Sequence, residues 1–311
     1  MILTLTTNAA LDRILLIDEF TPGGIMRPPN FIDRVGGKGL DVSVALRAVG
    51  AETVAISAVG GDTGRRLAGL LAGYGITTDL IWLEGETRLA HVIAEQRANR
   101  HSHIIAGNLP VTPEAVTQFL DRLQTHLPRA AWLVAGGTLP QGMPPDFYRQ
   151  ITALARQAGV PVLLDITGPP VAPALAQPPA VLKLNRQEFA ATFAAPPTDS
   201  IAGLVEQAAA VVGRHRLPAL VLTCGEDGLL GFTPEGVFRA VPPPQQAVNA
   251  AGAGDVSSAG LVWRLSLGDG WPEALRWAAA LSAASVLTIG TADVNLPDAE
   301  RILPAVTVEP L

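Results

Sequence analysis

Short apolar runs alternate with amphipathic segments along most of the chain, and this alternation limits the folds that it can adopt. Continuously apolar runs rich in Val, Leu and Ile are typical of strands covered on both faces. Alternating strands and helices predict an α/β fold, in which a mostly parallel sheet carries helices on both sides. The predicted strands are MILTLTT (1–7), TVAISAVG (53–60), AAWLVAGG (130–137), PVLLDIT (161–167), AVLKLN (180–185) and ALVLTCG (219–225). The predicted helices cover 40–49, 64–73, 114–126, 145–158 and 201–215.

Two segments, 12–34 and 86–105, break the alternation. They contain the strand-like runs RILLIDEF, FIDRV and TRLAHVIAEQ. Ligands in such sheets bind beyond the carboxyl ends of the strands, so a small second sheet above that edge would act as a lid. We expect a single domain, 1–311, that carries this lid. The residues at the predicted strand ends are Asn8, Gly136, Asp165, Asn185 and Gly225.

The composition argues against several classes of function. The net charge of −6 offers no basic surface for nucleic acid. No apolar run has the length of a membrane span, and the N-terminal MILTLTTNAALDR lacks the basic segment of a signal peptide. The single cysteine, Cys224, excludes an intrachain disulfide and a site of clustered thiolates. We therefore expect a cytoplasmic protein that binds neither nucleic acid nor membranes.

A glycine-rich stretch, AAGAGDVSS (250–258), leads into a helical pattern that we expect to begin near Gly254 or Asp255. Small residues let a ligand approach the backbone amides, and a helix N-terminus favours an anion. Asp255 would then either cap the helix or accept a proton from a hydroxyl that attacks a phosphoryl group. The sequence alone leaves both roles open.

A second glycine-rich stretch, RVGGKGLDVSVALRAVG (34–50), also precedes a helical pattern. It holds Lys38, which with Lys183 makes up the only two lysines among 22 basic residues. A compact ammonium donates hydrogen bonds as a point charge, which a guanidinium cannot imitate. A tight turn and a chance placement of the lysines are the alternatives. Neither stretch is a dinucleotide fingerprint or a P-loop, because Ser257 stands where a third glycine belongs and GxxxxGK[ST] occurs nowhere.

Nine short motifs occur in order, and together they resemble the ribokinase-like carbohydrate kinases of the PfkB family. The branch that they resemble most is that of 1-phosphofructokinase and tagatose-6-phosphate kinase. Each motif alone is weak, but nine in register over nearly the whole chain form a specific signal. The resemblance implies a three-layer α/β/α fold with a mostly parallel central sheet and a small β-sheet lid. The motifs are NAALDR (8–13), GGKGLDVS (36–43), GGDTG (60–64), GETR (85–88), GGTLPQGMP (136–144), LLDITG (163–168), LKLNRQE (182–188), TCGEDG (223–228) and AGAGD (251–255).

The resemblance also implies a site, position by position. Asp255 corresponds to the family's catalytic base, and Gly252, Ala253 and Gly254 correspond to its anion hole. The positions that correspond to the ATP side are Lys183, Asn185, Thr223, Gly225 and Gly228, with Glu188 binding Mg²⁺ through water. The positions that correspond to contacts with sugar hydroxyls are Asp12, Gly37 and Asp41, and those near a substrate phosphate are Lys38 and Arg88.

Two departures from the family pattern put the substrate in question. Asp41 stands where the sugar-phosphate branch has asparagine, and an ionised aspartate only accepts hydrogen bonds and adds negative charge near an anionic substrate. A helix cap is the alternative role for Asp41. The segment ANRHSHIIAGN (98–108) offers Arg100, His101 and His103 where substrate contacts are expected, and an exposed lid histidine is the alternative for His103.

The expected function is that of an ATP- and Mg²⁺-dependent sugar kinase acting on a ketohexose phosphate. One alternative is a kinase of an unphosphorylated sugar, nucleoside or polyol, which Asp41 favours and which Arg88 with Lys38 disfavours. Another is a non-catalytic regulator that binds a nucleotide or a sugar on the same fold. By analogy with the family, the expected assembly is a homodimer.

Overall fold

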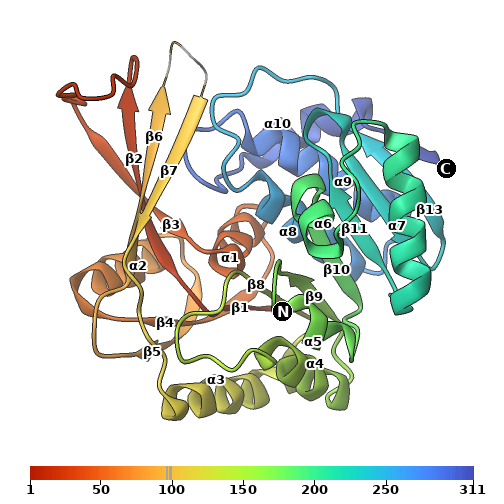
Figure 1. Cartoon of the computed structure of the whole chain (residues 1–311), viewed down its shortest axis with the longest axis horizontal. Helices are drawn as coiled ribbons and strands as arrows, with labels where there is room; N and C mark the ends of the chain where they lie inside the picture. Colours follow the sequence, from red (N-terminus) through yellow and green to blue (C-terminus); the bar gives the residue numbers. More distant parts are fainter. Residues whose placement is uncertain (96, 98–99) are drawn as a thin grey trace.

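The main sheet of the computed structural model has ten strands, in the order β14-β13-β12-β11-β10-β9-β8-β1-β4-β5 (Figure 1). The structure describes residues 1–95, 97 and 100–311, and of the segment 98–108 that the sequence singled out, residues 98 and 99 lie outside this description. The parallel strands are β1 (Ile2–Thr6), β4 (Thr53–Val59), β5 (Thr77–Trp82), β8 (Trp132–Gly136), β9 (Val162–Asp165), β10 (Val181–Asn185) and β11 (Leu220–Thr223). The antiparallel strands at one edge are β12 (Leu229–Thr233), β13 (Gly236–Val241) and β14 (Thr307–Pro310).

The predicted α/β fold is therefore confirmed, and each of the six predicted strands forms. The sequence did not predict β5 or the antiparallel β12, β13 and β14, which lie at or near the two edges of the sheet. β12 is buried from Leu229 to Phe232, but β5, β13 and β14 are buried unevenly and so lack the continuous apolar run on which the prediction relied. In β5, for example, only Ile81 is buried.

Helices cover both faces of the main sheet, because alternate side chains of each strand point to opposite faces. Leu3 and Leu5 of β1 join one core cluster, whereas Ile2 joins the other. The helices of the first face are α3 (Pro113–His126), α4 (Phe147–Gln157), α5 (Val171–Leu175), α6 (Arg186–Phe193) and α7 (Ile201–His215). Those of the second face are α1 (Lys38–Ala48), α8 (Ala253–Ser266), α9 (Trp271–Ser285) and α10 (Leu296–Ile302). The short 3₁₀ turns are η1 (Leu127–Arg129), η2 (Gly225–Asp227) and η3 (Leu303–Ala305).

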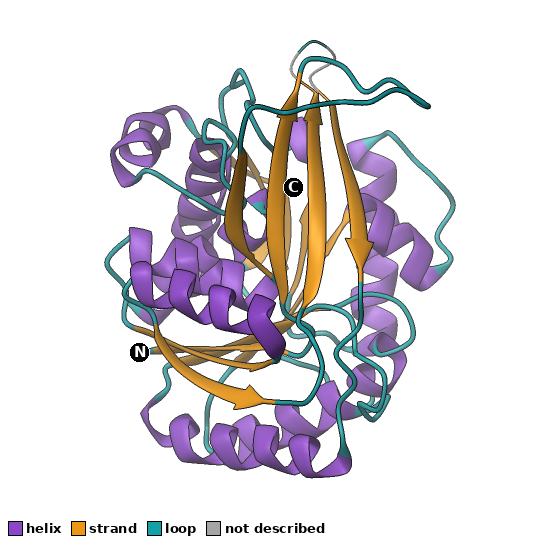
Figure 2. Cartoon of the chain, turned by 90° about the vertical axis from the view of Figure 1, so that its left-hand side faces the viewer, coloured by secondary structure: helices purple, strands orange, loops and turns teal. Residues whose placement is uncertain are grey.

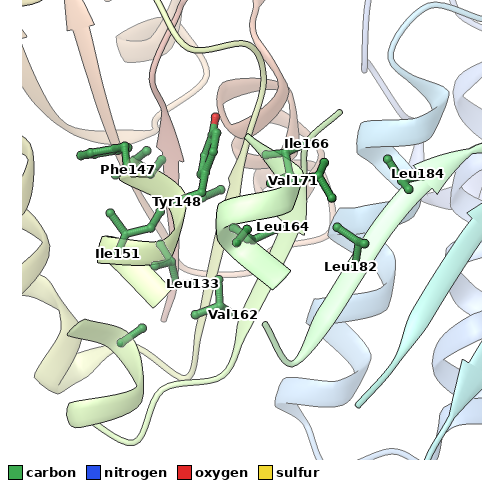
Figure 3. Close-up of a cluster of buried hydrophobic side chains, with 14 of the residues drawn as sticks. Leu133, Phe147, Tyr148, Ile151, Val162, Leu164, Ile166, Val171, Leu182 and Leu184 are labelled. Carbon is green, nitrogen blue, oxygen red and sulfur yellow. The ribbon is translucent and has the colours of Figure 1, made fainter. Parts of the chain in front are cut away.

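The core of the first face positions one polar group toward the strand ends (Figure 3). Phe147, Tyr148 and Ile151 of α4 pack on Leu133 and Leu164 of the sheet, and all five are fully buried. The Tyr148 hydroxyl points away from this apolar cluster and donates to the backbone oxygen of Gly137 at 2.8 Å. A buried Tyr hydroxyl needs such a partner.

The second sheet stands on the main body, as Figure 2 shows, and its order is β3-β2-β6-β7. Its strands are β2 (Ala10–Ile17), β3 (Phe31–Gly36), β6 (Arg88–Glu95) and β7 (Arg100–Ala106). We call this four-stranded sheet the lid. It forms from the two segments that break the sequence alternation, and its strand β2 pairs parallel with β6, although β3 and β7 are antiparallel to their neighbours.

Two carboxylates tie the base of the lid to the helical layer. Asp33 of β3 accepts hydrogen bonds from Arg13 of β2 at 2.7 and 2.9 Å and also from Arg66 of α2 (Gly61–Gly73). Asp293, in the loop after α9, accepts from Arg34 of β3 at 3.0 Å and from the Tyr74 hydroxyl at 2.8 Å. The lid is therefore fixed at its base by charge-assisted hydrogen bonds.

No helix within the described ranges has both the length and the apolar character that crossing a membrane requires.

Candidate active site

The carboxyl ends of neighbouring parallel strands bring polar residues together at one edge of the main sheet. In the register of the sheet, Asp165 of β9 pairs with Gly136 of β8 on one side and with Lys183 of β10 on the other. Asn185 of β10 pairs in the same way with Thr223 of β11. The edge that the sequence indicated thus collects residues from four strands.

Asp165 is a buried carboxylate that binds both lysines of the chain. Its Oδ2 accepts a hydrogen bond from Lys183 Nζ at 2.7 Å, and its Oδ1 accepts one from Lys38 Nζ. Burial alone would raise the pKa of Asp165, but the two ammonium groups lower it to about 2. Gly136 leaves room for this arrangement, because a Cβ there would lie 3.2 Å from the Cβ of Lys38. Both lysines therefore converge on one charged carboxylate.

Glu188 is a second carboxylate beside Lys38, and it also stabilises the start of α6. Its Oε1 accepts from Lys38 Nζ at 3.3 Å, while its Oε2 accepts the backbone N–H of Asn185 at 2.8 Å. The Asn185 side chain in turn accepts the backbone N–H of Glu188 at 2.8 Å, which completes a capping box. The motif NRQE thus has a structural role in addition to the one that the sequence suggested.

Glu188 and Asp165, whose two oxygens both accept from lysines, are the carboxylates here that could bind a magnesium ion through water. Mg²⁺ in kinase sites commonly takes one or two carboxylates and completes its shell with waters and substrate phosphates. Among the residues that the structure describes, no three His, Cys, Asp or Glu side chains gather as a complete metal cage. Any divalent ion here would therefore share its coordination with water and a phosphorylated ligand.

The first turn of α8 offers backbone amides without a side-chain cap. Its N-cap is Gly252, in the left-handed region at φ 78°, and a Cβ there would lie 2.5 Å from the backbone nitrogen of Ala292. Among the described residues no side chain caps this helix. The Lys183 ammonium lies beside the same turn, 3.5 Å from where a Cβ of Gly254 would stand. Amides and ammonium together make this turn suitable for an anion.

Asp255 lies inside this first turn and is not the N-cap, since α8 begins at Ala253. The interpretation of Asp255 as a mere cap is therefore wrong. Burial and the charge of Asp165 raise the pKa of Asp255 to about 7, against the lowering effect of Lys38 and Lys183. A carboxyl with such a pKa exchanges a proton readily at neutral pH, which suits a general base.

A largely apolar cavity of about 390 Å³ opens beside the same turn. Its position next to Gly254 would put a bound nucleotide's phosphates close to the start of α8. Its lining includes Thr223, Gly225, Gly228, Ala253 and Gly254, together with Pro242, Pro243 and Pro244, Ala279, Ser282, Ala283 and Val286. Gly228 has φ 86°, and a Cβ there would lie 2.1 Å from the backbone oxygen of Ala240, so no larger residue fits this turn.

The predicted substrate side lies where the lid meets α1. Asp12 of β2 packs against Gly36, where a Cβ would lie 2.2 Å from the Asp12 carboxylate. Burial raises the pKa of Asp12 to about 6, although Thr291 and Arg88 lower it. Gly37, at φ 116°, is the N-cap of α1. A Cβ at Gly37 would lie 2.8 Å from the Thr6 side chain, so only glycine suits this turn.

Asp41 lies in the first turn of α1 and does not cap it, because the N-cap is Gly37. Its side chain is buried, with 4% of the residue exposed. Burial and the nearby charges of Asp255 and Asp12 raise the pKa of Asp41 well above its ordinary value. The expectation that Asp41 adds a negative charge assumed an ionised side chain, and this environment opposes ionisation.

The two cations assigned to a substrate phosphate have different partners. Lys38 binds Asp165 and Glu188, as described above. Arg88 donates instead to the backbone oxygens of Asn8 at 2.8 Å and Ala9 at 3.4 Å, where β6 meets β2. Arg88 therefore lies at the junction of β6 and β2, on the predicted substrate side, while Lys38 belongs to the carboxylate cluster at the strand ends.

Two residues that organise the site had no role predicted from the sequence. Asp165 was noticed as a strand-end residue but was given no role, although it holds both lysines. Asn249 fixes the loop before α8: its Oδ1 accepts the N–H of Ala251 at 2.9 Å, and its Nδ2 donates to Ile289 O at 2.8 Å. The position of Asp165 in the motif LLDITG was a usable signal, whereas nothing local marked Asn249.

Comparison with known proteins gives a consistent result. The model of the pfkB family carbohydrate kinases matches residues 6–299. D-tagatose-1-phosphate kinase of Bacillus licheniformis is 30% identical over 298 residues, which cover 96% of this chain and 96% of that protein. 1-Phosphofructokinase of Bacillus subtilis is 29% identical over 310 residues, which cover 99% of each protein.

Solved structures agree on the fold. A structure described as a possible 1-phosphofructokinase from Thermotoga maritima superposes with a TM-score of 0.90 at 26% identity, covering 100% of this chain and 99% of that one. Phosphofructokinase-2 from Escherichia coli gives a TM-score of 0.90 at 24% identity and covers 98% of both chains. The overall fold is thus shared over nearly the whole length of these chains.

The raised pKa values of Asp255 and Asp12 predict that the ligand-free protein loses stability as the pH rises from about 4 to about 7. In this window the folded state holds protons that the unfolded chain has released, so the free energy of unfolding falls with pH. Each pKa unit corresponds to about 1.4 kcal/mol. Asp255→Asn removes one such group and should therefore be more stable than the wild type at pH 8, with a smaller gain at pH 5.

Urea unfolding from pH 5 to pH 8 measures this effect. Asp62→Asn is the matched control, because the Asp62 side chain is 92% exposed, and it should follow the wild type at every pH. If the free energy of unfolding of Asp255→Asn also had the same pH dependence as that of the wild type, Asp255 would not be a buried group that holds a proton near neutral pH.

Proposed function

The chain belongs to the pfkB family of carbohydrate kinases, and we propose that it transfers the γ-phosphoryl group of ATP to a hydroxyl of a ketohexose phosphate. The observation that carries this proposal is the uncapped first turn of α8, which holds Asp255 beside the Lys183 ammonium. Phosphoryl transfer depends on positioning and on charge stabilisation more than on covalent chemistry. This turn supplies both, together with a proton acceptor.

In the proposed reaction, Asp255 accepts the proton of the attacking sugar hydroxyl. In the predicted anion hole of Gly252, Ala253 and Gly254, the amides of Gly252 and Gly254 stabilise the negative charge of the phosphoryl group in transfer, while the Ala253 N–H donates to the backbone oxygen of Ala250 at 3.3 Å. Lys183 lies beside this turn and remains bound to Asp165, so its position is fixed before substrate arrives. The lid would exclude water from the reacting groups and limit hydrolysis of ATP.

The cavity beside α8 is suited to the nucleotide. Its apolar lining favours a flat base, and Thr223, Gly225 and Gly228 border it on the side of β11. We propose that Mg²⁺ binds next to it, with Asp165 and Glu188 as the nearest carboxylates and with waters between protein and ion. Bound there, Mg²⁺ would neutralise phosphate charge.

The substrate class rests on Arg88 and on the relatives. The relatives from Bacillus licheniformis and Bacillus subtilis are named for D-tagatose 1-phosphate and for a fructose phosphate, and both are similar to this chain over nearly its whole length. Arg88 uses two of its donors on backbone oxygens and keeps others for a ligand. A guanidinium matches two phosphate oxygens, so Arg88 is the proposed contact of the substrate phosphate.

If Asp255 is the proton acceptor, Asp255→Asn should lower kcat by roughly 10²-fold or more, which is the usual scale for acid–base catalysis. ATP binding should remain, because the cavity lining is unchanged. Steady-state turnover with Mg-ATP and fructose 1-phosphate measures the effect. Asp269→Asn, at the opposite end of α8, is the control and should keep the wild-type kcat. A near-normal kcat for Asp255→Asn would rule out this residue as the base.

Arg88→Ala should raise KM for a sugar phosphate by roughly 10- to 150-fold, because losing a hydrogen bond to a charged group costs about 1.5–3 kcal/mol. KM for ATP should stay nearly constant. The test compares fructose 1-phosphate, tagatose 1-phosphate, tagatose 6-phosphate and fructose 6-phosphate with their unphosphorylated parents. Arg122→Ala on α3, which removes an arginine bound to Asp79, is the control. An enzyme that prefers the neutral sugars and is indifferent to Arg88 would favour a kinase of unphosphorylated substrates instead.

Glu188→Gln should raise the Mg²⁺ concentration needed for half-maximal rate. Glutamine keeps the capping box, so the variant removes the charge without removing the helix start. Titration of kcat with Mg²⁺ at fixed ATP measures the shift, and Glu114→Gln in the first turn of α3 is the control. Equal Mg²⁺ dependence in wild type and Glu188→Gln would leave Glu188 with only its capping role.

A further inference from the structure

Asp41 combines near-complete burial with an unpaired oxygen. The residue is 4% exposed, and its Oδ1 has no hydrogen-bond partner among the described residues. Buried polar atoms are nearly always paired, so each exception requires an explanation. An ionised carboxylate with one oxygen left unpaired in such a place would be costly to bury.

The groups that face Asp41 make ionisation less favourable still. Asp255 of α8, Asp12 of β2 and Asp293 of the loop after α9 all act on it as like charges. The phenol of Tyr74 also lies within electrostatic range of Asp41, and it already donates its hydrogen bond to Asp293. In contrast to these groups, a hydrogen bond from the backbone N–H of Gly37 favours the charged form of the Asp41 side chain.

Three cations lie in this part of the site, and each has a hydrogen-bond partner other than Asp41 among the described residues. Lys38, on the same helix, binds Asp165 and Glu188. Arg34 of β3 binds Asp293, and Arg88 of β6 donates to backbone oxygens and acts on Asp12. Asp41 therefore lies among carboxylates without a counter-ion of its own among the described residues.

We propose that Asp41 is held as a neutral carboxylic acid and that, in this form, it donates a hydrogen bond to the anionic sugar substrate. A protonated carboxyl both donates and accepts, as an asparagine amide does, whereas a carboxylate only accepts. In this neutral form, Asp41 places no negative charge near a substrate phosphate. This inference rests on the proposed function for its substrate, but the protonation state can be tested without any substrate.

The neutral acid has a kinetic consequence. When the pH rises enough to ionise Asp41, the protein loses a donor and gains a negative charge beside an anionic ligand. KM for the sugar phosphate should therefore rise at alkaline pH in the wild type. Asp41→Asn keeps a neutral donor at every pH, so this alkaline rise should be absent from the variant.

Infrared spectroscopy of the ligand-free full chain tests the protonation state directly. At pH 8, Asp12 and Asp255 are mostly ionised, since their pKa values are about 6 and about 7. The wild type should then show a C=O stretch of a protonated carboxyl that Asp41→Asn lacks and that the control Asp12→Asn keeps. The double variant Asp12→Asn, Asp255→Asn should keep it too. Absence of this band from the wild type and from the double variant would overturn the proposal.

Kinetics with fructose 1-phosphate at pH 7 test the donor role. Asp41→Asn should keep KM within about 2-fold of the wild type, while Asp41→Ala should raise it by roughly 2- to 12-fold, the range for one neutral hydrogen bond. A fall in KM in both variants would show that Asp41 is an ionised, repelling group. If no sugar phosphate were turned over at all, the proposed function would fail, whereas the infrared result would still decide the protonation state.

Discussion

The pairing of Asp165 with both lysines is the interaction on which the rest of the site depends. One buried carboxylate at the end of β9 holds Lys183 beside the start of α8 and holds Lys38 beside Glu188. Breaking such a cluster by removing one partner leaves an uncompensated buried charge, which is strongly destabilising. The sheet register puts Asp165 next to Gly136 and Lys183 and so fixes the position of Lys183, whereas Lys38 reaches Asp165 from the start of α1.

Three other buried carboxyl groups of the site resist ionisation. Asp255, Asp41 and Asp12 come from α8, α1 and β2, and burial raises the pKa of each. This arrangement lowers stability above neutral pH, but it supplies a proton acceptor whose pKa is close to 7. Residues that weaken the fold locally are expected at active sites, where function requires them.

The sequence predicted the central strands and the lid because both depend on local patterns of apolar residues. It missed β5, β13 and β14, whose mixed burial follows from their position at or near the edges of the finished sheet, and it also missed β12, although that strand is mostly buried. The motifs indicated Asp255, Glu188 and Arg88, but not that Asp165 joins the two lysines, since these contacts need the register of β9 with β10 and the position of α1. The charge state of Asp41 could not be predicted from the sequence either, because it follows from burial among residues far apart in the chain.

The central claim is that this chain phosphorylates a ketohexose phosphate, and ³¹P NMR of the reaction products tests it most directly. Wild-type protein is incubated with Mg-ATP and fructose 1-phosphate, and in parallel with the unphosphorylated ketose. The account predicts that a second phosphate ester forms on fructose 1-phosphate in step with ADP, and that the unphosphorylated sugar reacts far more slowly. Faster phosphorylation of the unphosphorylated sugar, or release of inorganic phosphate and ADP with no new ester, would contradict it.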